Sequence, residues 1–406
     1  MRENVYKWTA IKRLTFSLLI VSIYILGSNL AFPGISTQFY INLLHNSPGL
    51  SLAFGATGLS LEHISLFTIG LSPWMSTLIL WQVLSVTKII TSENLTIAQS
   101  YRIKFILCLF LGIIQSLGIL SQVSFIDNHS TTYVVSIVLI LIAGMCIIIW
   151  LGNMNVQYGV GGSTLLIMIN IIKNLSHSIV NTHILTLFYS ENIFVKVATL
   201  FFIFFILFII FRFFQGERRL PLVHVMLDGK YASQSYLPIS INLAGGMPFI
   251  YAFSIMLFPQ YIVSLMGQLI DTKDLYNQLL IDHALGGTLL IVIIILLTYG
   301  FSYINIDYKT LADNFKKSGD YFVNVYPGKN TERYIFHRTT EVATVVAIFN
   351  SLTIGLPLVF AGLMNQKTDV VYLIPTIIMI MLLMQGICTQ FHQAYYRNSY
   401  QTFLKD

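Results

Sequence analysis

The stretch "NLAGGMPFIYAF", residues 242–253, places two glycines and a proline where a continuous apolar helix would otherwise be expected. Proline lacks the backbone N–H that a helix interior needs, and its ring clashes with the preceding turn. A second apolar run is interrupted in the same way by "GLSPWMS", residues 70–76. The sequence therefore predicts two interrupted helices, with breaks at Pro73, Gly245, Gly246 and Pro248.

The composition around these breaks is that of a membrane protein. The chain has 406 residues, of which 55% are hydrophobic and 10% are charged, whereas soluble domains carry about 25% charged residues. A membrane-spanning helix needs about 20 mainly apolar residues. This length predicts ten spanning segments, at residues 14–33, 64–86, 104–124, 132–151, 161–181, 194–214, 240–266, 284–305, 338–362 and 370–391.

The positive charges support this count. If both termini are cytoplasmic, 19 of the 23 lysines and arginines fall in cytoplasmic segments: four in the N-terminal tail, three between helices two and three, four between six and seven, six between eight and nine, and two in the C-terminal tail. Cytoplasmic loops are enriched in these residues. The net charge of +6 is thus explained by topology, and nucleic-acid binding is not expected.

Residues 47–62, "SPGLSLAFGATGLSLE", are apolar but too short to span a bilayer. They precede the second helix on the predicted outer side and should fold back as a re-entrant element. Such an element is stable only when it packs within protein or lines a wet cavity. Together with two broken helices, it points to a central site or pore.

The sequence lacks the groups that other functions need. Proton- or ion-coupled carriers use charged residues at mid-membrane, but the polar residues in these helices are mainly neutral: Gln82, Gln115 and Asn242. Neither a metal-binding motif nor a catalytic cluster is recognisable, so no enzyme, metal or cofactor is predicted. Cys108, Cys146 and Cys388 lie in apolar runs and are expected to be buried packing residues. A channel, a secondary transporter and a membrane transferase are the alternatives, and the channel is favoured.

Several motifs, in the same order along the chain, resemble the SecY family of protein translocase channels. The most specific are the run "SYLPI-x-x-N-x-AG-x-x-P-x-I" from residue 235 and "ADN-x-KKSG…PGKNT" from residue 312; "WLGNMNVQYGVGGSTLLIM" and "ERRLPL" also match. The resemblance implies an all-α polytopic membrane protein. Its ten transmembrane helices would form two inverted five-helix halves, residues 1–181 and 182–406, around an hourglass pore with a plug. The plug would be residues 47–62, and a lateral gate would open between helices two and seven.

The resemblance also implies two sets of residues inside the membrane. A constriction ring would consist of apolar or small side chains that seal the pore by dewetting: Leu71, Met75, Thr164, Met168, Ile250 and Ile380. A polar cluster at the lateral gate would consist of Gln82, Gln115 and Asn242.

Two cytoplasmic loops, residues 215–238 and 306–337, would receive a SecA-type motor ATPase. The candidate docking residues are Arg218, Arg219, Lys316, Lys317, Tyr326, Lys329 and Arg333. Tyr326 departs from the family pattern, in which arginine precedes the Pro-Gly pair, and the chain is short with few loop charges. These departures resemble the accessory SecY channels of Gram-positive bacteria.

The resemblance implies a channel subunit in a bacterial cell membrane, with both termini cytoplasmic, that exports large serine-rich glycosylated surface adhesins. Its partners would be an accessory SecA-type motor, small SecE-like or accessory membrane subunits, and a preprotein with a signal sequence. A housekeeping SecY-type channel is the alternative.

Overall fold

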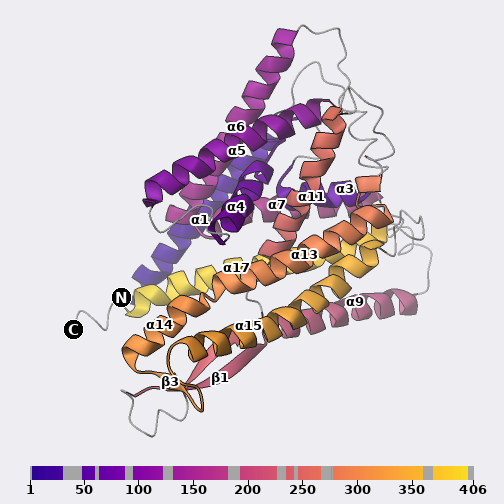
Figure 1. The fold of residues 1–406 in the computed structure, drawn as a ribbon. Helices are drawn as coiled ribbons and strands as arrows, with labels where there is room; N and C mark the ends of the chain where they lie inside the picture. Colours follow the sequence, from indigo (N-terminus) through magenta and orange to yellow (C-terminus); the bar gives the residue numbers. More distant parts are fainter. Residues whose placement is uncertain are drawn as a thin grey trace. The chain divides into compact units, whose positions relative to one another are not determined.

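A computed structural model describes residues 2–30, 48–59, 64–86, 95–121, 131–181, 193–225, 235–241, 246–266, 276, 278–359 and 369–400. Helices make up most of these residues, as predicted (Figure 1). The elements in order are α1 (Arg2–Ser28), α3 (Pro48–Thr57), α4 (Ser72–Val86), α5 (Ile97–Leu120), α6 (Thr131–Tyr158), α7 (Gly162–Asn181), α9 (Ile193–Phe214), β1 (Glu217–Val223), β2 (Tyr236–Ser240), α11 (Met247–Met266), α13 (Ala284–Asn305), α14 (Tyr308–Ser318), β3 (Tyr321–Phe322), α15 (Lys329–Asn350), the π-helical turn η2 (Ser351–Gly355) and α17 (Asp369–Tyr400).

The chain divides into two compact units. Unit 1 comprises residues 1–184, 249–290 and 358–406, and unit 2 comprises residues 185–248 and 291–357. The predicted halves, residues 1–181 and 182–406, were based on the inverted repeat that the family resemblance implies, whereas the two units are defined by which residues contact one another. Because the two divisions rest on different criteria, the halves stay a prediction.

Each of the ten predicted segments contains a helix. Within the described residues, seven stretches are long and apolar enough to cross a bilayer: Ile11–Ser28, Ile97–Leu120, Thr132–Tyr158, Met247–Met266, Ala284–Ser318, Lys329–Val359 and Tyr372–Gln393. The other three segments hold α4, with 15 residues, and the shorter apolar parts of α7 and α9. The structure therefore supports a polytopic membrane protein, and it is consistent with ten membrane-spanning helices.

The two helices that were predicted to be interrupted instead begin at the predicted breaks. Pro73 is the second residue of α4 and Pro248 is the second residue of α11. The first turn of a helix has no intrahelical partner for its N–H groups, so proline fits there without kinking the helix. Gly246 lies just before α11, while Gly245 lies outside the described residues. The prolines inside α11 and α17 are Pro259 and Pro375, which the sequence pattern did not single out.

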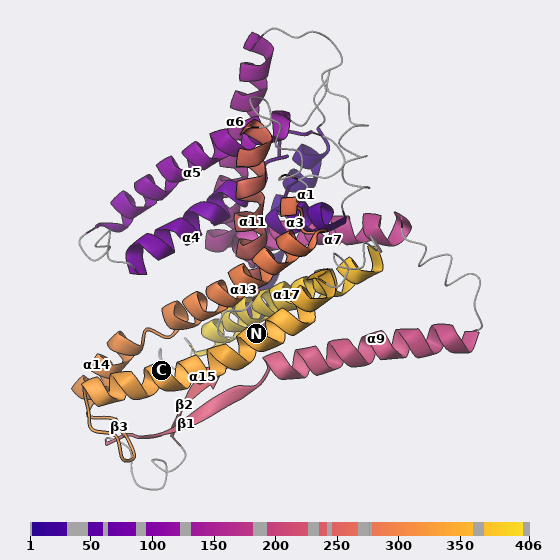
Figure 2. The ribbon, with the colours of Figure 1, turned by 45° about the vertical axis from the view of Figure 1, so that its right-hand side comes forward.

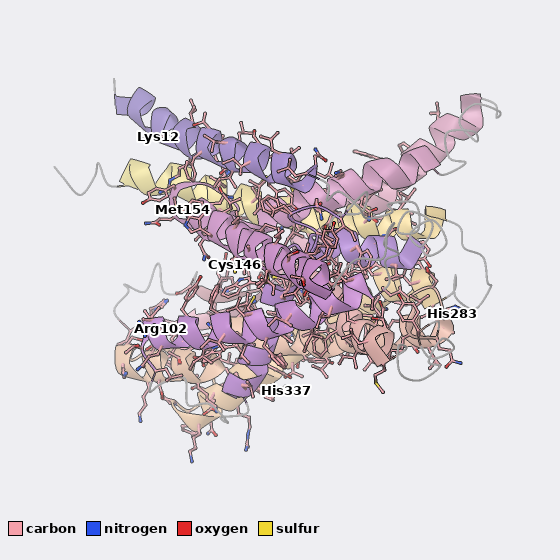
Figure 3. The ribbon with its side chains drawn as sticks, turned by 90° about the horizontal axis from the view of Figure 1, so that it is seen from above. Lys12, Arg102, Cys146, Met154, His283 and His337 are labelled. Carbon is pink, nitrogen blue, oxygen red and sulfur yellow. The ribbon has the colours of Figure 1, made fainter. Side chains whose placement is uncertain are left out.

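Unit 1 is assembled around α7, which packs against α3, α6 and α17, while α1 packs against α6 and α17. The start of α1 and the end of α17 lie at the same end of this unit (Figure 1). Seen from above, Lys12 and Arg102 lie toward one side of unit 1 and His283 toward the other (Figure 3). The predicted topology also puts Lys12 and Arg102 on one side of the membrane and His283 on the other; which side is cytoplasmic stays a prediction.

A sharp turn leads into α4. Gly70 has a φ of +58°, and a Cβ on it would lie 2.1 Å from the carbonyl oxygen of Gly58. Only glycine fits this left-handed conformation and this close approach. The turn brings the chain that follows α3 against the start of α4, so the predicted plug and the first ring residue, Leu71, are neighbours.

Unit 2 contains a small sheet that the sequence did not predict. Its strands are antiparallel in the order β2-β1-β3, and Arg219 pairs with Pro238 in the register. The two predicted cytoplasmic loops therefore fold together, and β1 and β3 lie at the end of α15 away from η2 (Figures 1 and 2). A core of buried apolar side chains joins the sheet to α15: Leu220, Leu222, Ile239, Ile306, Phe322, Ile335, Val342 and Val346. At the other end of the unit, Phe213 of α9 stacks on Phe349 of α15 with ring centroids 3.8 Å apart.

Candidate functional site

The six predicted ring residues all belong to unit 1. Five of them lie on α4, α7, α11 and α17, and Leu71 lies in the turn just before α4. Leu71 and Met75 are each 2% exposed and Ile250 is fully buried. Thr164 and Met168 lie one helical turn apart on α7, and both are half-buried, as is Ile380 on α17. Their arrangement around one opening stays a prediction.

The segment predicted as the plug contains α3, a helix of ten residues. Leu52, Ala53 and Phe54 are at most 5% exposed. A helix of this length rises about 15 Å, half the bilayer's apolar thickness. It packs against α7 and α17 of unit 1, so it has the burial that a re-entrant element requires. Residues 47 and 60–62 of the predicted plug lie outside the described residues.

Side-chain amides of α7 bind the backbone of this segment. Asn174 donates from Nδ2 to the carbonyl oxygen of Ser51 at 2.6 Å, and Asn170 donates to that of Leu59 at 2.7 Å. The Tyr24 hydroxyl of α1 donates to the carbonyl oxygen of Gly58 at 3.3 Å. A hydrogen bond between helices in a membrane contributes about 0.6 kcal/mol on average. Three of them contribute about 2 kcal/mol, enough to favour the docked helix but weak enough to break.

These plug contacts were not predicted, although a signal for them was present. Asn170 and Asn174 are spaced i, i+4 on an apolar helix, which places two amides on one face. Both are 4% exposed, so each amide must find a partner inside the protein.

Serine hydroxyls connect the two helices of the predicted lateral gate. The hydroxyl oxygens of Ser76 on α4 and Ser254 on α11 lie 2.8 Å apart, and Ser254 donates to the carbonyl oxygen of Ser72 at 2.9 Å. All three side chains are buried. This serine cluster (Ser72, Ser76, Ser254) was not among the predicted gate residues.

The predicted amide cluster is only partly described. Gln82 is half-buried on α4, and Asn242 lies outside the described residues. Gln115 on α5 is fully buried, and neither its amide oxygen nor its nitrogen has a hydrogen-bond partner within the described ranges. A gate cluster formed by these three amides therefore stays a prediction.

In unit 2, the carboxylate of Glu341 lies within ion-pair distance of three basic side chains. Glu341 on α15 forms an ion pair with Arg218 on β1. Arg338 Nη1 lies 3.0 Å from Glu341 Oε1, and His337 Nε2 lies 3.3 Å from the same oxygen. Arg218 was predicted as a docking residue, but here it links the sheet to α15.

A second polar contact lies at the edge of the sheet. His224 Nδ1 is 2.9 Å from Asp320 Oδ1, and Ser318 donates to Asp320 Oδ2 at 2.7 Å. Desolvation raises the pKa of Asp320, but the hydrogen bonds from Ser318 and His224 outweigh it, so the pKa lies below its usual value.

The other candidate docking residues are exposed. Tyr326 has 80% of its side chain exposed. Lys316 and Lys317 form the last turn of α14, Lys329 begins α15, and Arg333 lies one turn further along. Arg219 is exposed, pairs with Glu217 at 2.7 Å and covers the ring of Tyr236. These side chains are therefore available to a partner protein, and binding stays a prediction.

No cluster of three or more potential metal ligands occurs in the part of the chain that the structure describes. Of the three cysteines expected to be buried, Cys108 is buried, Cys146 is half-buried and Cys388 is exposed. The prediction is therefore wrong for Cys388, whose face of α17 is not covered by the described residues.

The fold and these contacts define a polytopic membrane protein with a short helix packed inside a bundle. The SecY family model matches residues 65–388, and this chain belongs to the SecY family. It is 31% identical over 412 residues to the accessory Sec system protein translocase subunit SecY2 of Leuconostoc gelidum subsp. gasicomitatum, covering 96% of both chains. It is 30% identical over 380 residues to the protein of the same name from Streptococcus oralis, covering 92% of both.

The fold agrees with this assignment. A solved structure described as "The structure of a protein conducting channel" superposes with a TM-score of 0.66 at 13% identity, over 95% of this chain and 93% of the other. The predicted family is thus confirmed, and the chain is a multi-pass membrane protein that serves as a protein-conducting channel subunit, a class that is not enzymatic.

Proposed function

We propose that this channel subunit serves an accessory Sec system and exports large serine-rich, glycosylated surface adhesins. The observation that carries the proposal is near-complete alignment with a relative named as an accessory Sec subunit, over 96% of both chains. Tyr326 supports it, because it stands where the general family pattern leads one to expect arginine. The adhesin class rests on the resemblance alone.

The proposed channel works through three movable parts. In the resting state α3 lies docked beneath the constriction ring, the ring seals the pore by dewetting, and the serine cluster joins the gate helices α4 and α11. An arriving signal sequence competes with the serine cluster and parts the helices. The hydrogen bonds from α1 and α7 to the predicted plug segment contribute only about 2 kcal/mol together, so the advancing chain displaces it.

The proposed partners would supply the energy for export and would cover the exposed basic and apolar surfaces of the channel. A motor ATPase of the SecA type supplies energy and docks on the exposed basic side chains of unit 2, which include Lys316, Lys317 and Arg333. Small SecE-like or accessory membrane subunits cover apolar helix faces. The proposed location is a bacterial cell membrane, with unit 2's sheet and both termini on the cytoplasmic side.

Cross-linking tests the channel itself. An export substrate is arrested in transit, and a photo- or thiol-reactive group is placed at Met75, Met168 or Ile250. Adducts are expected at all three positions. Leu139 on α6, which is 62% exposed, is the matched control and should give none. Adducts at Leu139 without adducts at the ring positions would overturn the pore assignment.

Motor exchange tests the accessory assignment. Vesicles containing the channel are supplied with either the accessory motor or the general motor of the same cell. Export with the accessory motor alone is expected. Equal export with the general motor would favour a housekeeping channel.

A further inference from the structure

One buried carboxylate joins three distant segments of unit 1. Asp282 lies in the turn just before α13 and is 8% exposed. Its Oδ1 accepts the backbone N–H of Gly49 at 2.8 Å and the hydroxyl of Tyr372 at 2.5 Å. Gly49 belongs to α3, and Tyr372 belongs to α17, where it is 5% exposed.

The contact with Gly49 is a helix cap supplied from outside the helix. Gly49 is the second residue of α3, and the first four N–H groups of a helix have no intrahelical partner. The first turn of α3 has no acidic residue of its own. A carboxylate at this end accepts an orphan N–H and opposes the positive pole of the helix. Asp282 does both from a position 233 residues away.

The backbone of α3 approaches this turn so closely that only glycine fits. A Cβ on Gly49 would lie 2.7 Å from Asp282 Oδ1 and 2.9 Å from Cβ of Ile281. An alanine would therefore separate the N–H from the carboxylate. The hydrogen bond and the lack of space for a side chain therefore describe one close contact between α3 and Asp282.

We propose that Gly49, Asp282 and Tyr372 form a latch that positions α3 in its docked state. This Asp282 latch rests on the proposed role of α3 as the plug. Because Asp282 binds α3 and α17 through one oxygen, a shift of α17 or of the turn before α13 loosens the plug's N-terminal end. Asp282 is a positioning residue, and the latch couples plug release to movement of the surrounding helices.

The test measures leakage of a small dye from vesicles that contain the full-length channel with its membrane subunits and no substrate. A hydrogen bond to a charged group shifts an equilibrium by roughly tenfold or more, so Asp282→Ala should raise the leak by about that factor. Asp282→Asn keeps an acceptor and should leak less. Tyr372→Phe should leak least of the three. Gln278→Ala, an exposed neighbour on the same connection, should match the wild type.

Two further variants separate the possible outcomes. Gly49→Ala should leak like Asp282→Ala, and the double variant should leak no more than either single variant; additive leaks would overturn a shared contact. Deletion of residues 48–57 tests the plug itself. If the deletion leaks but the Asp282 and Tyr372 variants do not, the latch is wrong and the plug stands. If the deletion does not leak either, the plug role and the latch fail together. The cross-linking experiment still tests the pore assignment separately.

Discussion

Replacement of Ser254 by alanine should make the lateral gate easier to open. Ser254 makes two short hydrogen bonds from α11 to α4, one with the hydroxyl of Ser76 at 2.8 Å and one to the carbonyl oxygen of Ser72 at 2.9 Å; its hydroxyl also lies at 3.4 Å from that of Ser72, too far to add much. At about 0.6 kcal/mol each, loss of the two short bonds destabilises the closed gate by about 1.2 kcal/mol. Ser76 also lies 3.0 Å from the Ser72 carbonyl oxygen in its own helix, so its hydroxyl keeps a partner and the net cost is nearer 1 kcal/mol.

A free-energy change of about 1 kcal/mol raises the open population about fivefold. The assay compares export of a reporter carrying signal sequences with progressively shortened apolar cores, in cells with the complete motor and channel. The Ser254→Ala channel should export signals that the wild type rejects. Ser136→Ala is the matched control, because that hydroxyl donates to the carbonyl oxygen of Tyr133 in its own helix at 2.7 Å. Equal export by both variants, or no gain with Ser254→Ala, would refute the reasoning.

Three other substitutions test separate parts of the molecule. Gln115→Met should leave stability unchanged or raise it slightly, because a buried amide that finds no partner among the described residues is costly; a looser gate in the same export assay would instead show that Gln115 helps to hold the gate closed. Tyr326→Arg should change thermal stability by less than about 0.5 kcal/mol, since the side chain is exposed, but should alter affinity for the accessory motor; unchanged binding would remove Tyr326 from the docking surface. Glu341→Gln should weaken the ion pairs with Arg218 and Arg338, and because these groups are partly exposed the loss of stability should be small, with a slightly lower unfolding temperature that high salt makes indistinguishable from wild type.

The membrane architecture could be predicted because its signals are local. A run of about 20 apolar residues is sufficient to place a helix, and all ten predicted segments contain one. The position of Pro73 and Pro248 relative to the helix ends could not be predicted. A proline in an apolar run is compatible with either a kink or a first turn, and neighbouring segments decide which forms.

The sheet of unit 2 was missed for a similar reason. Both β1 and β2 contain a proline, Pro221 and Pro238, which normally argues against a strand. The structure places Pro238 on an edge strand and Pro221 at the end of the β1–β2 pairing, where the absent N–H costs little. Arg218, which pairs with Glu341, and Gly49 and Tyr372, which bind Asp282, come from distant segments, so no local pattern could have paired them.

The hydrogen bonds to α3 and its flanking turn have a consequence for evolution. Those from Asn170, Asn174 and Tyr24 go to carbonyl oxygens, and that of Asp282 comes from a backbone N–H. These four bonds use backbone atoms of the segment, but they need three of its glycines: a Cβ on Gly49 would meet Asp282 Oδ1 at 2.7 Å, a Cβ on Gly55 would meet Asn174 Nδ2 at 2.6 Å, and Gly58 has a φ of +81°. The remaining positions can therefore drift, and a segment transplanted from a distant relative should dock if it keeps these three glycines and small apolar residues.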